Sequence, residues 1–198
     1  MQEDNSTIKL IVISVLGGIL LLILAIFAFE GKEQTVSLPI KFEQFTDFQC
    51  PACAAYHSPI NSLISEYSDN VAYTFVNYPL LQLHPESKLA HQAGVAAANQ
   101  GQFEAYATIL FSNQDAQSEA DLLKYAGDLG LDVELFKNDM YLAETIAKVD
   151  NDMKYGESLN INYTPAFYIN GERVTIKEGD DPMQVLRDTL NELIAKAQ

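Results

Sequence analysis

Along most of the chain, the order of apolar and polar positions predicts strands that alternate with helices. Residues 40–48 (IKFEQFTDF) alternate and are rich in aromatic side chains, and 71–80 (VAYTFVNYPL) combines β-branched and aromatic residues, so both are predicted strands. Between them, 50–67 has helical composition, with Pro51 in the first turn, where a missing N–H is tolerated. We expect Pro59 to kink this helix.

The second half of the chain predicts more helices and then a hairpin. A long stretch after the second strand carries apolar residues at three- and four-residue spacing, which indicates several helices. The dipeptide Asn170-Gly171 between two extended runs predicts a β-hairpin, and 182–197 predicts a closing amphipathic helix. The order indicates an α/β layered domain made of a βαβ half and a ββα half, with a helical insertion at about 85–150.

The N-terminal region is apolar enough to cross a membrane. Leu10–Phe29 contains twenty residues without one charge, and at ~1.5 Å per residue a helix of that length spans a ~30 Å hydrocarbon core. A cleaved signal peptide is the alternative, but Ile26 before Ala28 forms a poor cleavage site, so we expect a retained transmembrane anchor. The expected organisation is a short tail at 1–9, the anchor at 10–29, a linker at 30–37 and a folded domain at 38–198.

The charge of the chain bears on its partners. The formal net charge is −15, and the acidic residues are scattered rather than clustered. Such a surface repels phosphate backbones, so nucleic acid is not an expected partner.

Both cysteines of the chain lie in CPAC, at the junction between the first predicted strand and the following helix. At positions three apart on a helix, Cys50 and Cys53 share a face, so their sulfurs can form a disulfide. Cys50 also lies at the positive end of the helix dipole, which favours a thiolate. We therefore expect an exposed attacking sulfur at Cys50 and a buried resolving sulfur at Cys53.

The CxxC pair has two alternative interpretations, a zinc site and a structural disulfide. A closed zinc site needs four ligands, and the chain offers only two cysteines and three histidines, with no second CxxC motif. A purely structural disulfide closes a loop too short to stabilise the fold much. His57 could tune the cysteines from the same helix, although a surface histidine is commoner, and His84 and His91 are expected to pack or cap. Redox chemistry is therefore the favoured interpretation, with no cofactor and no metal.

A second motif stands far from the cysteines in the sequence. In NINYTPAFYING, Pro165 comes at the entrance to a strand of the hairpin. The residues alone leave this open, because an edge-strand or turn proline is the ordinary case and cis X–Pro bonds are only ~5–6% of the total.

Taken together, CPAC after an aromatic strand, the helical Pro59, the QGQFEAY segment and Tyr163-Thr164-Pro165 resemble a membrane-anchored DsbA-like thiol-disulfide oxidoreductase of the thioredoxin superfamily. The resemblance covers about residues 36–197. It implies a thioredoxin fold with an inserted helical subdomain, preceded by one transmembrane helix. It also implies that Pro165 is cis beside the cysteines and that Thr164 presents backbone groups to the substrate near Cys50.

Two features depart from the strongest oxidants of that family. Such relatives carry a histidine between the cysteines, whereas here the pair is Pro51-Ala52. We therefore expect a redox potential between the ~−120 mV of DsbA and the ~−270 mV of thioredoxin. Relatives also often place a buried acid under the second cysteine, but Gln44 stands at that position, and Glu43 should face the other side of the strand.

The expected function is the introduction of disulfides into cysteine-containing unfolded or exported proteins. From this chemistry we expect the catalytic domain to lie on the periplasmic or extracellular side of the cytoplasmic membrane. The resemblance implies that a membrane protein linked to quinone reoxidises it. Two alternatives stay open: an extracytoplasmic reductant with its own reductant partner, and a membrane-tethered binding module for unfolded chains in which the disulfide is incidental.

Overall fold

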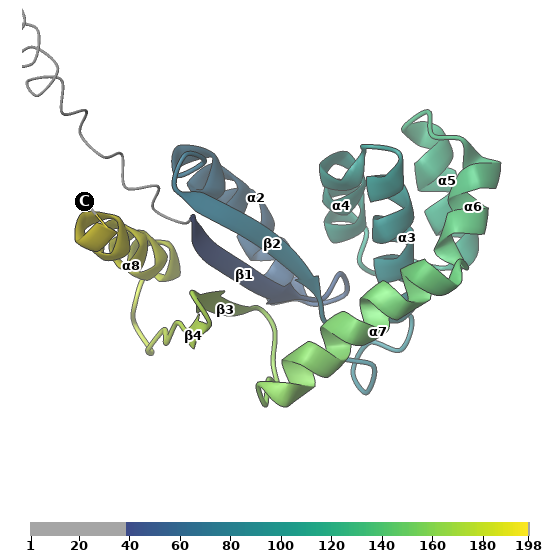
Figure 1. The fold of residues 1–198 in the computed structure, drawn as a ribbon. Coiled ribbons are helices and arrows are strands. Elements are labelled where there is room, and N and C mark those ends of the chain that lie inside the picture. Colours follow the sequence, from purple (N-terminus) through teal and green to yellow (C-terminus); the bar gives the residue numbers. More distant parts are fainter. Residues whose placement is uncertain (1–38, 198) are drawn as a thin grey trace, which may run out of the picture. The chain divides into compact units, whose positions relative to one another are not determined.

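The computed structural model describes residues 39–197, which form a sheet with helices on both faces (Figure 1). The predicted tail, anchor and linker all lie outside these residues. Within residues 39–197, no helix has the length and apolar character needed to span a bilayer. The elements are β1 (Ile40–Thr46), α2 (Pro51–Glu66), β2 (Val71–Asn77), α3 (Ser87–Asn99), α4 (Phe103–Ser112), α5 (Glu119–Asp128), α6 (Val133–Met140), α7 (Ala143–Ser158), β3 (Ala166–Ile169), β4 (Glu172–Arg173) and α8 (Pro182–Ala197).

The sheet has four strands in the order β2-β1-β3-β4. β1 and β2 are parallel, with Thr46 opposite Asn77 at the carboxyl end, whereas β1–β3 and β3–β4 are antiparallel. This is the predicted βαβ half followed by a ββα half. β1 ends two residues earlier than predicted because the chain turns there: the carbonyl of Asp47 accepts a hydrogen bond from the Cys50 N–H at 3.1 Å.

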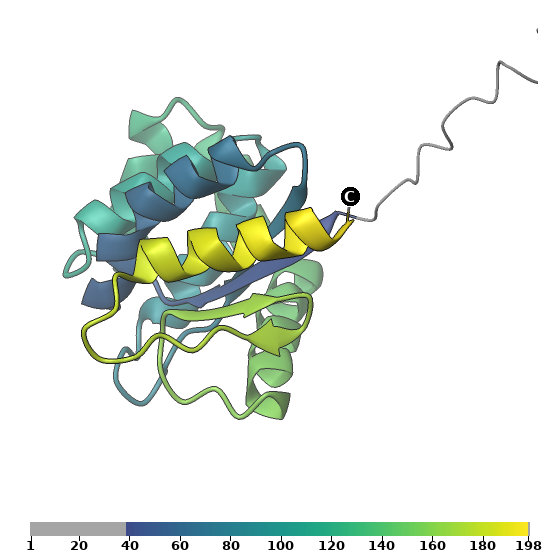
Figure 2. The same cartoon turned by 90° about the vertical axis from the view of Figure 1, so that its left-hand side faces the viewer.

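The two faces of the sheet carry different helices. α2 and α8 lie side by side over one face, where Phe42 of β1 packs with Ile60 and Leu186 in one apolar cluster (Figure 2). α7 crosses the opposite face beside β2, where Phe45 and Val76 form a second cluster. Since side chains alternate along a strand, neighbouring residues of β1 are buried on both sides.

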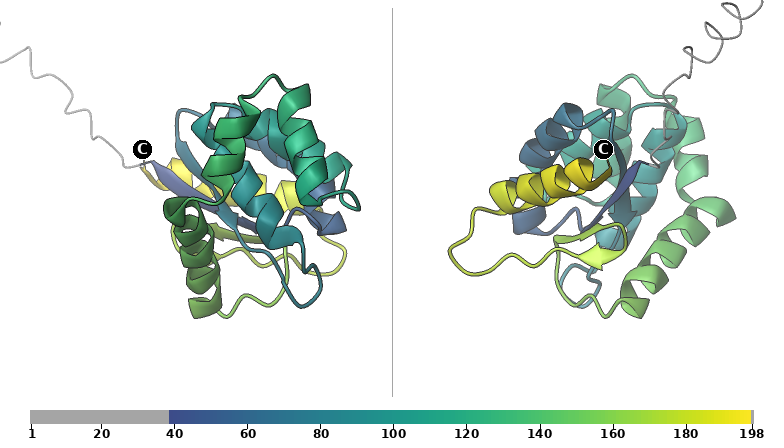
Figure 3. Two further views of the ribbon diagram at one scale, coloured as in Figure 1. Left: turned by 90° about the vertical axis from the view of Figure 1, so that its right-hand side faces the viewer. Right: turned by 60° about the vertical axis from the view of Figure 1, so that its left-hand side comes forward.

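Helices α3 to α6 form a helical lobe at one end of the sheet (Figure 3). Its buried residues include Tyr106 and Phe136, whose rings lie 5.2 Å apart. Residues 133–158 form two helices. Leu142 has extended backbone angles and separates α6, which packs on α3, from α7, which runs along the sheet.

Two local predictions concern proline and glycine. α2 continues through Pro59 to Glu66 as one helix. The hairpin turn is confirmed: Asn170 and Gly171 have φ of 51° and 83°, the left-handed conformation that this turn type requires.

Candidate active site

The two cysteines lie where β1 ends and α2 begins. Cys50 is the N-cap of α2, with an extended backbone conformation, and Pro51 occupies the first turn. The side chain of Cys53 is completely buried, as predicted. Cys50, expected to be exposed, is only 7% exposed, because neighbouring segments cover its sulfur.

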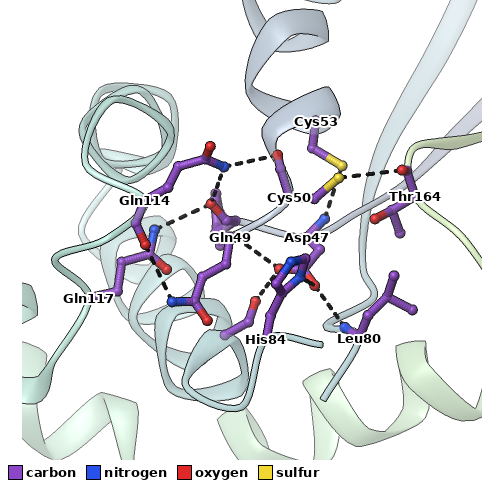
Figure 4. Close-up of polar contacts among 11 residues, drawn as sticks. Asp47, Gln49, Cys50, Cys53, Leu80, His84, Gln114, Gln117 and Thr164 are labelled. Atoms are coloured by element: carbon purple, nitrogen blue, oxygen red, sulfur yellow. Dashed lines mark hydrogen bonds and ion pairs between the residues drawn. The ribbon is translucent and has the colours of Figure 1, made fainter. Parts of the chain in front are cut away.

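The loop before β3, the strand next to β1, covers Cys50. The Thr164–Pro165 peptide bond is cis, as the resemblance implied. The carbonyl oxygen of Thr164 lies 3.4 Å from the Cys50 sulfur, and the dashed line in Figure 4 marks this contact. The structure therefore brings together four of the predicted site residues, Cys50, Cys53, Thr164 and Pro165, while Pro51 and Ala52 are exposed in the first turn of α2.

The surroundings of Cys50 favour its thiolate. A hydrogen bond from the Cys53 thiol lowers the pKa of Cys50 most; burial acts in the opposite direction, and the Thr164 hydroxyl and the backbone N–H groups of Cys53 and Ala52 add to the lowering. The result is a pKa of about 5. A sulfur that is ionised at neutral pH is the form that attacks disulfides.

Cys53 has the opposite character. Burial raises the pKa of its thiol, and the negative charge on Cys50 raises it further. Two groups at the end of β1 act against this: the hydroxyl of Thr46 and the backbone N–H of Asp47, which lies 3.5 Å from the Cys53 sulfur. The pair therefore divides into one ionised sulfur and one protonated sulfur, a division that suits sequential exchange.

The residue predicted to lie beneath Cys53 carries an amide. Gln44 is buried, and its side-chain oxygen accepts a hydrogen bond from the Tyr73 hydroxyl at 2.7 Å. Glu43, as predicted, faces away: its carboxylate accepts a hydrogen bond from Tyr155, in α7 on the opposite face. Neither residue therefore offers a carboxylate to Cys53.

A buried acid that was not predicted from the sequence lies at the same junction. Asp47 is fully buried, and its carboxylate accepts hydrogen bonds from four donors. These donors are the backbone N–H groups of Gln49 (2.9 Å) and Leu80 (2.7 Å), Nδ1 of His84 (2.8 Å) and the hydroxyl of Ser87.

The donors around Asp47 keep it ionised. Burial opposes ionisation, but nearby His91 and the hydrogen bonds from Ser87, Leu80 and His84 outweigh it, so the pKa of Asp47 lies below its usual value. An aspartate three residues before Cys50 was a visible signal for this arrangement. Its partners come from the β2–α3 loop and the start of α3, which periodicity does not place.

Glutamines join the helical lobe to the loop before Cys50 (Figure 4). The side-chain N–H groups of Gln114 donate to the carbonyl oxygens of Phe48 (2.8 Å) and Cys50 (2.9 Å). Gln117 donates to the same Phe48 carbonyl at 3.3 Å. These side chains therefore provide hydrogen-bond donors for two backbone carbonyls at the turn into α2.

The three histidines have different surroundings. His57 contacts Thr108 at 3.0 Å and the ring of Phe111, and within residues 39–197 it forms no hydrogen bond with either cysteine. His91 is buried, as expected for packing, and burial lowers its pKa to about 4. His84, in contrast, pairs with Asp47. Among residues 39–197, no cluster of three or more metal-ligating side chains is present.

Residues 36–188 match the family model described as thioredoxin. The chain belongs to the thioredoxin family. The match spans the sheet, the helical lobe and the beginning of α8, so both halves of the site lie inside it.

Solved structures of other thioredoxin-fold proteins resemble this one. A thioredoxin-like oxidoreductase from Silicibacter pomeroyi DSS-3 is 26% identical, with a TM-score of 0.68 over 79% of this chain and 87% of that one. BdbD from Bacillus subtilis, in its oxidised form, is 22% identical, with a TM-score of 0.65 over 83% of this chain and 91% of that one. The second likeness concerns the fold alone.

Curated relatives share only part of their length with this chain. A Na(+)/H(+) antiporter NhaA 1 from Mycobacterium sp. (strain KMS) is 31% identical over 137 residues, which make up 68% of this chain and 22% of the antiporter. A Na(+)/H(+) antiporter NhaA 3 from Salinispora tropica is 31% identical over 135 residues. The chain thus spans about a fifth of the length of these relatives.

Proposed function

We propose that this thioredoxin-family protein is a thiol-disulfide oxidoreductase that introduces disulfides into exported, cysteine-containing polypeptides. Its fold and its likeness to the oxidoreductase from Silicibacter pomeroyi support exchange chemistry in general. The observation that carries the oxidising role is the asymmetry of the two sulfurs, with the pKa of Cys50 lowered to about 5 and that of Cys53 raised.

In the proposed mechanism, a substrate thiolate attacks the Cys50 sulfur of the Cys50–Cys53 disulfide. The bond between the two cysteines breaks, a Cys50–substrate disulfide forms, and Cys53 leaves as a thiolate that then takes up a proton. A second substrate thiolate attacks the substrate sulfur of this mixed disulfide and expels Cys50 as a thiolate. The substrate is left with a disulfide, and two electrons remain on the Cys50/Cys53 dithiol.

The direction of electron flow follows from the stability of the Cys50 thiolate. Interactions that lower the pKa of Cys50 stabilise the reduced form of the pair and so raise its reduction potential. The Cys53 thiol and the backbone N–H groups of Cys53 and Ala52 supply such interactions without a histidine between the cysteines. We therefore assign the oxidant role ahead of the reductant role.

The cellular setting is part of the same proposal. Residues 10–29 would anchor the chain in the cytoplasmic membrane, with the site on the periplasmic or extracellular side, where disulfides persist. After each cycle, the dithiol would pass its two electrons to a quinone-linked membrane protein.

The decisive experiment is the redox equilibrium of Cys50/Cys53 in the full-length protein, in detergent, against defined ratios of reduced and oxidised glutathione. A potential well above the ~−270 mV of thioredoxin supports the oxidant, whereas a value at or below it supports the reductant. A Cys50→Ser variant separates both from a tethered binding module: if the variant retained full biological activity, the redox function would be wrong.

A further inference from the structure

The hydroxyl of Thr46 is an unusual group in the interior of this protein. Thr46 is the last residue of β1, its side chain is completely buried, and its oxygen has no hydrogen-bond partner within the described structure. A buried polar group without a partner destabilises a fold, so few such groups persist and each calls for an explanation.

The position of this hydroxyl is fixed by the strand. Because side chains alternate along β1, Thr46 shares a face with Phe42 and Gln44, and this is the face that α2 covers. Cys53 lies in the first turn of α2, and its sulfur is 3.5 Å from the backbone N–H of Asp47, the residue after Thr46. The hydroxyl is therefore carried by the residue next to that N–H, on the face that α2 covers, and its effect on the Cys53 sulfur is to favour the charged form.

Other polar groups near Cys53 are already engaged. The Tyr73 hydroxyl donates to Gln44, and the Asp47 carboxylate is held by its four donors. Cys50 disfavours charge on Cys53. Within residues 39–197, the Thr46 hydroxyl is thus a side-chain donor beside Cys53 whose hydrogen bond has not been used elsewhere.

We propose that the Thr46 hydroxyl donates a hydrogen bond to the Cys53 thiolate at the moment substrate attack on Cys50 breaks the Cys50–Cys53 disulfide. This inference rests on the proposed exchange at Cys50 and identifies the group that stabilises its buried leaving sulfur. The substrate thiolate bonds to the Cys50 sulfur, and the electron pair of the broken bond stays on Cys53. The substrate thiol loses one proton when it ionises, and Cys53 takes up one proton after it has left, so the number of bound protons is unchanged.

This role of Thr46 explains both how a buried thiolate can leave and why a buried hydroxyl has no partner in the dithiol. A leaving thiolate departs faster when its charge is stabilised, and a completely buried sulfur has no water to do this. The hydroxyl without a partner in the dithiol gains one only when charge develops on Cys53. Since the reverse reaction passes through the same transition state, Thr46 serves the attack of Cys53 on a mixed disulfide equally well.

The test compares Thr46→Val, which keeps the shape of the side chain, with Thr46→Ser, which keeps the hydroxyl. The rate at which reduced glutathione reacts with the oxidised full-length protein is followed in detergent by stopped flow. We expect Thr46→Val to slow this reaction about tenfold, in line with the loss of one hydrogen bond to a charged group, and Thr46→Ser to stay within about twofold of the natural protein.

Two further readouts distinguish this role from a structural one. The thiolate titration of Cys50 should be unchanged in Thr46→Val, and the melting temperature of its dithiol form should be equal or higher, because a buried group without a partner has been removed. Thr46→Ala provides the same comparison if the valine variant does not fold.

Equal rates for the natural protein and the variants without a hydroxyl would overturn the role of Thr46, as would a serine variant as slow as the valine variant. If the natural protein itself failed to exchange with glutathione, the proposed function would be wrong instead.

Discussion

The sulfur of Cys50 lies 3.4 Å from the carbonyl oxygen of Thr164, a residue 114 positions further along the chain. The first turn of α2 supplies Cys50 with backbone N–H groups and with the Cys53 thiol, but the fold is needed to bring the Thr164 hydroxyl to the same sulfur. The reactivity of Cys50 therefore depends on local and distant parts of the chain together.

The lowered pKa of Cys50 predicts its reaction with alkylating agents. In the reduced protein, the rate of iodoacetamide modification should rise with pH around a midpoint near 5 and reach a plateau by neutral pH. Mass spectrometry after brief labelling should locate the modification on Cys50 and not on the buried Cys53. A midpoint near 9.0, the ordinary pKa of a cysteine, would contradict the assignment.

The same pKa predicts a pH-dependent stability of the reduced protein. The folded pKa of Cys50 is about 5 against an ordinary value of 9.0, so the unfolded chain binds more protons between these values and stability rises with pH. Between pH 5 and 7 the gain should be roughly 2 kcal/mol in the free energy of unfolding. The oxidised protein, which has no titrating thiol, is the control in parallel urea titrations.

Variants of Thr164 and His57 should separate a group that acts on Cys50 from one that does not. Thr164→Val removes a hydroxyl that lowers the pKa of Cys50, so the thiolate titration should shift to higher pH. His57→Gln should leave the titration in place, because His57 contacts Thr108 and Phe111 instead. Ultraviolet absorbance of the thiolate measures both titrations. A shift in the His57 variant would support an electrostatic effect of His57 on the cysteines.

Asp47 should be important for stability. Asp47→Asn turns one acceptor into a donor that faces two existing donors, so we expect a loss of about 3 kcal/mol in the free energy of unfolding. Ser87→Ala, which removes a single donor, should lose only about 1 kcal/mol.

The contribution of Asp47 should also depend on pH in a defined direction. Its folded pKa lies below the ordinary 3.8, so its stabilising effect is complete above about pH 4 and is lost as pH falls through the lowered value. Urea unfolding at several pH values should therefore show the difference between natural protein and Asp47→Asn shrinking in strong acid. A difference that stayed constant in strong acid would contradict an ionised Asp47.

Periodicity and the spacing of the cysteines were sufficient to predict the strands, most helices and the CPAC junction, because these depend on neighbours in the sequence. The contact between Cys50 and the Thr164 loop was predicted only from the family resemblance. The partners of Asp47, the glutamine contacts of the helical lobe and the Thr46 hydroxyl were not predicted. They depend on which side chains meet when distant loops pack, and single-residue patterns carry no signal of that.

Gly156 lies in α7, and a substitution there tests how tightly this helix packs on the sheet. A Cβ added at Gly156 would lie 2.3 Å from the ring of Tyr78, which cannot easily move because its hydroxyl donates to the Ile161 carbonyl at 2.7 Å. Gly156→Ala should therefore lower the free energy of unfolding by about 2 kcal/mol.

The matched control is Gly127→Ala in α5, where the nearest atom, on Val133, would be 3.6 Å away in ordinary contact. Alanine there should stabilise the protein by about 0.5–1 kcal/mol, because it restricts the unfolded chain and favours the helix. Urea unfolding of both variants measures the contrast. Tyr78 directly follows β2, and its hydroxyl donates to Ile161, three residues before Thr164. A Gly156→Ala variant that folds should therefore also shift the Cys50 titration. Equal stability of the two variants would show that α7 can move away from the sheet without cost.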